Sequence, residues 1–151
     1  MKQITLIVAC LFASLVAGCG TTPTKQPEPR AIDEALREVT GQNGRTCVYI
    51  RDIRGYGTLS DSVLSVSARQ RKQYLMVTLY RCPSMQDNAG AAFWGAYTEF
   101  CGGGRDSVQA GARPCPVRSV FEFESRDDAF AAHDQALELI YGPEEESESE
   151  E

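Results

Sequence analysis

Cysteine is the residue type whose number and spacing carry the most chemical information in this sequence. The 151 residues include six cysteines, and the four that follow the apolar N-terminal segment are Cys47, Cys82, Cys101 and Cys115. None of these four has the C-x-x-C spacing that a thioredoxin-like redox motif or a zinc knuckle requires. An even number of widely spaced cysteines in an exported chain favours two disulfides and no metal. Three pairings are open, and our working hypothesis joins Cys82 to Cys101 and Cys47 to Cys115.

The segment "CGGGRDS", from Cys101 to Ser107, has the composition of a ligand-binding loop. Three consecutive glycines allow a backbone to approach a ligand closely, and Arg105 could hold a carboxylate or phosphate through two hydrogen bonds. The segment lacks the lysine and the following helix of a phosphate-binding loop. We therefore favour a loop that needs positive φ angles beside a disulfide, and we keep Arg105 and Asp106 as candidate binding residues.

Groups that could catalyse a reaction are few. His133 is the single histidine, which excludes a catalytic triad and a polyhistidine metal site. Two acids at the right separation suffice for a glycosidase, and the candidate acids are Asp52, Asp61, Asp106, Glu122 and Glu124. Positions i and i+2 of a strand share a face routinely, so we interpret these acids as solvated. We expect no catalytic residue and no cofactor; the alternative is an envelope enzyme that acts on glycan or peptidoglycan through carboxylates.

A binding module is the function class that competes with an enzyme. Trp, Tyr and Arg dominate interface hot spots, and the chain carries Tyr49, Tyr56, Tyr74, Tyr80, Phe93, Trp94 and Tyr97 together with Arg51, Arg54, Arg69, Arg71 and Arg81. Most of the aromatic residues belong to the core by default. The stretch "RQRKQYL" joins two predicted strands, which makes Arg69 and Arg71 candidate binding residues on a surface turn. An envelope protein or a glycan is the partner that we expect.

The N-terminal segment predicts export. Lys2, an apolar run from Ile4 to Val16, and the small residues Ala17 and Gly18 fit a signal peptide over residues 1–18, whereas a membrane span needs roughly 20 apolar residues. Residues Leu15–Cys19, "LVAGC", resemble a bacterial lipobox, which implies cleavage before Cys19 and lipidation of its thiol. An ordinary signal or a short span with a buried Cys19 is the alternative.

Residues 19–30 then predict a flexible tether, because they contain three prolines and no large apolar residue. The residue after the cysteine is Gly20 and not an aspartate. In lipoproteins of two-membrane bacteria this indicates export to the outer membrane. We therefore expect a lipid-anchored protein of the cell membrane, in the outer membrane and facing the periplasm.

Charge and residue pattern indicate one domain over residues 31–142. The chain has a formal net charge of −6, and six glutamates lie in residues 144–151, so residues 143–151 predict a disordered acidic tail. The mature part without that tail holds 14 basic and 15 acidic residues, and this balance gives no field for nucleic acid.

Residue pattern predicts a mainly β domain with flanking helices. Pro29 precedes a short helix that Gly41 and Gly44 end, and Ser125 caps a second helix that Gly142 and Pro143 end. Predicted strands cover residues 46–53, 62–68, 73–80, 92–100, 106–110 and 117–123, with the third apolar on both faces and central. The fold class is a small antiparallel sheet or barrel of about six strands with a C-terminal helix.

The segments "CVYIRDIRGYGTLSDSVLSV", "YLMVTLYRCPSM", "FCGGGRDSV" and "PCPVRSVFEF" carry a further resemblance. In this order they resemble a group of small exported proteobacterial proteins with four cysteines, over roughly Arg45 to Phe123. The chain departs from that group at "CGGGRD", where a shorter link to the aspartate is usual, and at Met85, where a leucine is usual. The group has no assigned activity, so the resemblance implies fold and export. The function expected here is a non-catalytic binding or structural accessory module in the cell envelope.

Overall fold

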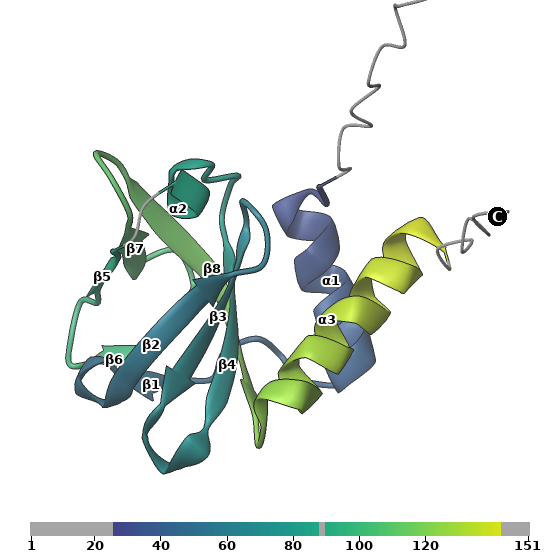
Figure 1. The fold of residues 1–151 in the computed structure, drawn as a ribbon, viewed down its shortest axis with the longest axis horizontal. Helices are drawn as coiled ribbons and strands as arrows, with labels where there is room; N and C mark the ends of the chain where they lie inside the picture. The colour runs from purple at the N-terminus through teal and green to yellow at the C-terminus, as the bar shows by residue number, and fades with distance from the viewer. Residues whose placement is uncertain (1–25, 88–89, 143–151) are drawn as a thin grey trace, which may run out of the picture.

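A computed structural model describes residues 26–87 and 90–142 of the chain (Figure 1). The signal peptide, Cys19, most of the expected tether and the acidic tail lie outside the described residues. Helix α1 (Pro29–Thr40) begins two residues before the expected start of the domain.

Six antiparallel strands form one curled sheet in the order β2-β3-β4-β8-β7-β5. Their bounds are β2 Ile53–Thr58, β3 Val63–Ala68, β4 Gln73–Thr78, β5 Ala92–Trp94, β7 Ser107–Gln109 and β8 Pro114–Phe123. Strand β4 lies inside the sheet and is apolar on both faces, because Tyr74 and Met76 join one core cluster and Leu75 and Val77 the other. The predicted mainly β fold and the central position of this strand are confirmed.

Two predicted strands are each broken in the structure. Residues 46–53 contribute only β1 (Val48–Tyr49) before a 3₁₀ turn η1 (Ile50–Asp52), and residues 92–100 are divided between β5 and β6 (Glu99–Phe100). Strands β1 and β6 pair with each other as a separate antiparallel ribbon, extended by the bond from the Ile50 amide to the Thr98 carbonyl. We call β1 and β6, with residues 50 and 98, the β1–β6 ribbon.

Strand β2 was not predicted, because its glycines have the composition of a turn. Gly55 and Gly57 instead leave room for neighbouring serines: a Cβ added to either would lie 3.3 Å from the Ser67 hydroxyl or 3.4 Å from the Ser65 hydroxyl. The edges β2 and β5 approach each other through side chains, since the Tyr56 and Phe93 rings lie 6.0 Å apart in an edge-to-face contact. The curl is therefore closed by aromatic packing at this seam.

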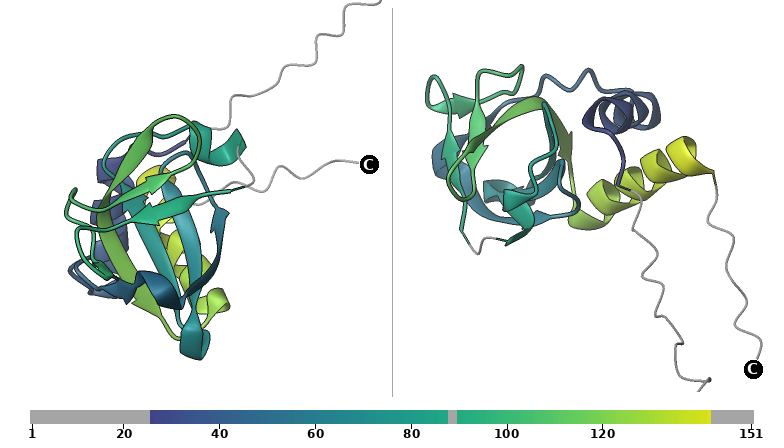
Figure 2. Two further views of the ribbon diagram at one scale, coloured as in Figure 1. Left: turned by 90° about the vertical axis from the view of Figure 1, so that its left-hand side faces the viewer. Right: turned by 90° about the horizontal axis from the view of Figure 1, so that it is seen from above.

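Helices α1 and α3 (Arg126–Tyr141) lie together on one face of the sheet, as Figures 1 and 2 show. Ser125 caps α3 as predicted, because its hydroxyl accepts a bond from the Asp128 amide at 3.1 Å. The side of α3 nearest the core consists mainly of small residues: its buried positions are Ala129, Ala132, His133 and Ala136. Small alanines allow the helix to approach its neighbours closely, and Phe130, Leu137 and Ile140 stay only partly buried.

Two short elements complete the fold. A 3₁₀ turn η2 (Arg69–Arg71) joins β3 to β4, and the short helix α2 (Ser84–Asp87) follows β4. Among the described residues, no helix has both the length and the apolar character of a membrane span.

Candidate functional site

Two disulfides are present, but the predicted pairing is wrong. Cys47 bonds Cys101 and Cys82 bonds Cys115. The ribbon register explains the first pair: Val48 lies opposite Phe100, so the residues before β1 and after β6 face each other. Cys82 and Cys115 join the core cluster inside the curl, with exposed fractions of 7% and 2%, whereas Cys47 is exposed. The two disulfides therefore differ in their access to solvent.

The glycine segment after Cys101 is a structural loop. Gly102, Gly103 and Gly104 have φ angles of 73°, 83° and 82°, which an L side chain rarely adopts. The amides of Gly103 and Gly104 donate to the carbonyls of Arg118 and Val117 at 2.8 and 2.7 Å. These amides are consumed inside the fold, so they cannot cradle an anion, while Arg105 remains exposed.

Asp106 has a structural environment. Its side chain is buried; one carboxylate oxygen accepts the Ala96 amide at 3.1 Å and the other accepts the Cys101 amide at 2.6 Å. The two oxygens thus hold the two ends of the segment from Ala96 to Cys101, which contains β6. This geometry places Asp106 in the framework of the ribbon and away from a ligand.

The other four candidate acids are each paired with a cation. Asp61 is buried and lies 2.5 Å from the Arg81 Nε, and Asp52 lies 3.5 Å from the Arg69 Nε. Glu124 and Glu122 both contact the Lys72 ammonium, Glu122 at 2.9 Å, and these bonds raise the pKa of Lys72 above its usual range.

The predicted basic turn is confirmed as the β3–β4 connection, with Gln70 and Arg71 at φ angles of 59° and 62°. Arg69 forms an ion pair with Asp52 of η1, and Arg71 is exposed. Arg69 and Arg71 therefore lie on the surface, on a different connection from the β6–β7 loop that carries Arg105 and Asp106.

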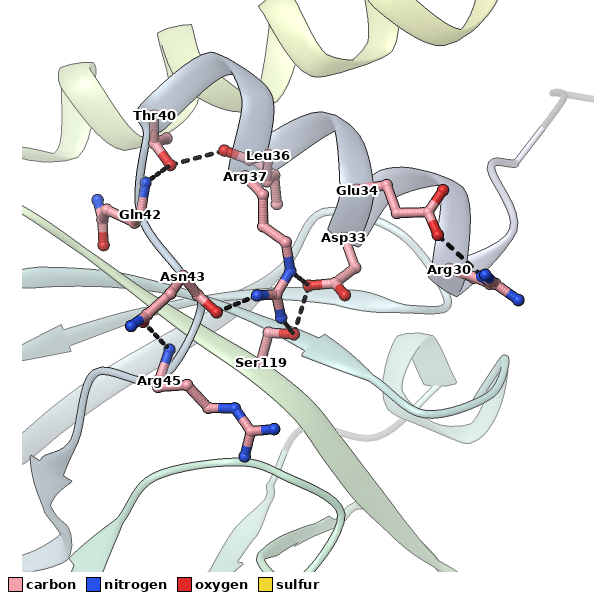
Figure 3. A network of polar contacts seen from close by, with 10 residues as sticks. All are labelled: Arg30, Asp33, Glu34, Leu36, Arg37, Thr40, Gln42, Asn43, Arg45 and Ser119. Carbon is pink, nitrogen blue, oxygen red and sulfur yellow. Dashed lines mark hydrogen bonds and ion pairs between the residues drawn. The ribbon is translucent and has the colours of Figure 1, made fainter.

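A buried polar network between α1 and β8 was not anticipated (Figure 3). The Ser119 hydroxyl donates to Asp33, the Arg37 Nε donates to the same carboxylate oxygen at 3.2 Å, and the Arg37 Nη2 reaches the Ser119 Oγ at 3.2 Å. Ser119 is fully buried, so a substrate cannot reach its hydroxyl. The network joins α1 to the sheet. The i,i+4 spacing of Asp33 and Arg37 was the available signal.

His133 lies on the buried side of α3. Burial lowers the pKa of His133, and its Nδ1 lies 3.5 Å from the Asp134 carboxylate. Its Nε2 is buried with no hydrogen-bond partner among the described residues. A neutral imidazole in this position is a packing group.

The exposed aromatic residues gather mainly on one part of the fold. Tyr49, Trp94 and Tyr97 are exposed to 44%, 61% and 83%; Tyr49 lies on β1, Trp94 ends β5, and Tyr97 lies in the segment between β5 and β6. A pocket of about 430 Å³ is lined by Tyr49, Ile50, Arg51 and Thr98. We call Tyr49, Arg51, Trp94, Tyr97 and Thr98 the ribbon surface.

Arg51 and Glu99 both interact with Tyr49. The Arg51 guanidinium lies 5.2 Å from the ring centroid, a cation–π geometry. A hydrogen bond with Glu99 raises the pKa of the Tyr49 hydroxyl and fixes the ring. Among the described residues, Arg51 forms no ion pair with a carboxylate, so its N–H groups remain available.

Residues 1–138 match a family of unknown function, DUF6491. The chain belongs to this family. The match includes the N-terminal segment and both disulfides of this DUF6491 chain, and it ends within α3. No curated protein and no solved structure matches the chain.

Proposed function

We propose that this DUF6491 chain is a lipid-anchored cell-envelope protein whose domain is a non-catalytic binding module. The observation that carries the proposal is the ribbon surface, which holds three of the four most exposed aromatic side chains of the described residues and an arginine without a carboxylate partner among them. Residues of these types supply most of the binding energy in protein interfaces and ligand pockets.

The state of the candidate catalytic groups supports the absence of catalysis. Each of the five candidate acids has a cation or backbone amides as its partner. Ser119 is sealed inside the fold, and His133 is buried on a helix. A general acid or base must reach the proton that it transfers, and neither Ser119 nor His133 is accessible to a substrate.

The anchor would leave the ribbon surface accessible. From Cys19 to Gln26 is seven residue steps, which span at most about 25 Å. The described chain leads directly into α1, and the helices lie on the opposite side of the sheet from β5 and the β1–β6 ribbon (Figure 1). A lipidated Cys19 would therefore attach on the helix side of the domain, and the ribbon surface lies on the other side. Two or more acyl chains give a stable anchor.

Mass spectrometry of the mature N-terminus tests the anchor. We expect a diacylglyceryl-modified Cys19 as the first residue. The Cys19→Ala variant should carry no lipid and should remain an uncleaved precursor or be cut at another position; the form cut elsewhere should leave the membrane fraction. Cys10→Ala is the matched control and should retain the lipid. An unmodified N-terminus at another residue of the wild-type chain would refute the anchor.

An activity screen on peptidoglycan and glycan substrates tests the absence of catalysis. We expect no turnover by the purified chain. Turnover that is lost on replacing one of the five acids with alanine would establish the carboxylate enzyme instead.

A further inference from the structure

We infer that the ribbon surface binds a neutral, hydroxyl-rich saccharide in the pocket formed by Tyr49, Ile50, Arg51 and Thr98. This inference rests on the proposed function, since it names the ligand class of the same surface. The pocket volume of about 430 Å³ falls within the range of small-ligand sites, roughly 300–1,000 Å³. A protein partner would need about 800 Å² of surface on each side, which four lining residues do not provide.

The charges around the pocket favour a neutral ligand. Arg51 contributes a cation beside the Tyr49 ring, and Glu99 contributes an anion at the hydroxyl of the same residue. The nearby Asp52 is paired with Arg69. These charges compensate each other locally, so the pocket offers little net attraction for a phosphate or an ammonium group. A saccharide hydroxyl can accept from the Arg51 guanidinium, while Glu99 stays paired with the Tyr49 hydroxyl.

The aromatic residues complete the chemistry. The C–H face of a pyranose ring is apolar, and exposed Tyr and Trp rings present large rigid apolar surfaces beside polar groups. Two further exposed rings belong to the chain that leads to the pocket: β5 ends at Trp94, and Tyr97 directly precedes the lining residue Thr98.

The surface is also held in place before a ligand arrives. One disulfide and three hydrogen bonds fix both strands of the ribbon. They are the Cys47–Cys101 disulfide, the backbone hydrogen bond between Ile50 and Thr98, and the hydrogen bonds that the Ala96 and Cys101 amides donate to Asp106. A pre-organised site loses less conformational freedom on binding, which matters for a ligand that offers mainly hydroxyl groups.

Calorimetric titration of the full chain tests the inference, in a detergent whose head group is not a sugar. The probes are a trimer of N-acetylglucosamine, which is neutral, a trimer of galacturonic acid, which is acidic, and a neutral Ser/Thr heptapeptide. We expect saturable binding of the neutral trimer, with an affinity that does not fall as salt rises. The chain has one tryptophan, so a change in Trp94 emission on binding places the ligand at the ribbon surface.

Matched variants assign the binding to named residues. Arg51→Ala and Tyr49→Ala should each weaken the neutral trimer about tenfold. Arg54→Ala replaces an exposed arginine on β2, and Tyr80→Ala replaces a tyrosine exposed to 55% elsewhere; both should leave the affinity unchanged. Circular dichroism verifies that each variant is folded. If Arg51→Ala is unfolded, Arg51→Lys replaces it in the titration.

Several results would overturn the inference. They are the absence of trimer binding, tighter binding of the acidic trimer, binding of the peptide alone, or equal loss in the control variants. None of these results bears on the lipid anchor, which mass spectrometry of the mature N-terminus tests separately. Conversely, hydrolysis of a bound trimer would refute the non-catalytic function while supporting the saccharide site.

Discussion

Asp33→Ala should destabilise the domain by about 2–3 kcal/mol, because Asp33 links α1 to β8 through a buried network. The substitution removes the acceptor of the Ser119 hydroxyl, and leaving a buried donor without its partner costs about 1–3 kcal/mol. It also removes the i,i+4 pair with Arg37, whose side chain is 35% exposed. Solvent screens the ion pair between Asp33 and Arg37, so we assign its loss no more than about 1 kcal/mol.

The network also predicts a coupling between its members. Ser119→Ala alone should cost about 1–2 kcal/mol, because Asp33 retains the Arg37 guanidinium as a donor. In the double variant the two buried groups disappear together, so its loss should be smaller than the sum of the single losses by about 1 kcal/mol. Glu34→Ala is the matched control, since its pair with Arg30 is solvent-exposed, and it should change stability by less than about 0.5 kcal/mol.

Urea unfolding followed by far-UV circular dichroism measures these differences, with both disulfides kept oxidised. The slope of free energy against urea should stay constant, which shows that the same surface is exposed on unfolding. A loss below about 0.5 kcal/mol for Asp33→Ala would refute this reasoning. Strict additivity of the two single variants would do the same, because it would mean that the contact drawn in Figure 3 is not energetically coupled.

Three further predictions concern the disulfides, His133 and the tail. Mild reductant should open Cys47–Cys101 before the buried Cys82–Cys115, and mass mapping of alkylated cysteines should recover Cys47 and Cys101 first; the reverse order would contradict the exposure argument. Burial lowers the folded-state pKa of His133 below its unfolded value of about 6.5, so the unfolded chain binds more protons as pH falls and stability is lost below that pH. Urea unfolding between pH 7.5 and 5.5 should show this loss, at no more than about 1.4 kcal/mol per pH unit, and His133→Leu should remove that contribution; an unchanged pH dependence in the variant would contradict it. Deleting residues 143–151 should leave the free energy of unfolding unchanged within about 0.5 kcal/mol, measured in the same urea assay, and a larger loss would show that the tail docks on the domain.

Local signals in the sequence were sufficient for the elements that depend on neighbouring residues. Ser125 and Asp128 predicted the start of α3, and the apolar run in β4 predicted a central strand, because capping and two-faced burial are both expressed within a few positions. The number of disulfides followed from the cysteine count. Their pairing did not, since it depends on the register between β1 and β6, which are 50 positions apart.

The features that sequence reasoning missed share a physical cause. Gly55 and Gly57 have the composition of a turn, but in β2 their missing side chains accommodate serines of β3. Asp33 lies on the apolar side of α1, where a charge is expected only with a partner, and that partner comes from β8, 86 positions away. In each case the deciding neighbour is distant in sequence, and no local pattern contains it.

The β1–β6 ribbon connects the framework residues to the proposed binding surface. Each of its strands has two residues, and an isolated ribbon of this length is not stable in water. Its position therefore depends on the Cys47–Cys101 disulfide and on the Asp106 carboxylate, which holds the amides of Ala96 and Cys101. The cysteine, glycine and aspartate of "CGGGRDS", which have the composition of a ligand loop, thus build the support. The residues left to meet a ligand are the aromatic side chains and the arginine that this support presents to solvent.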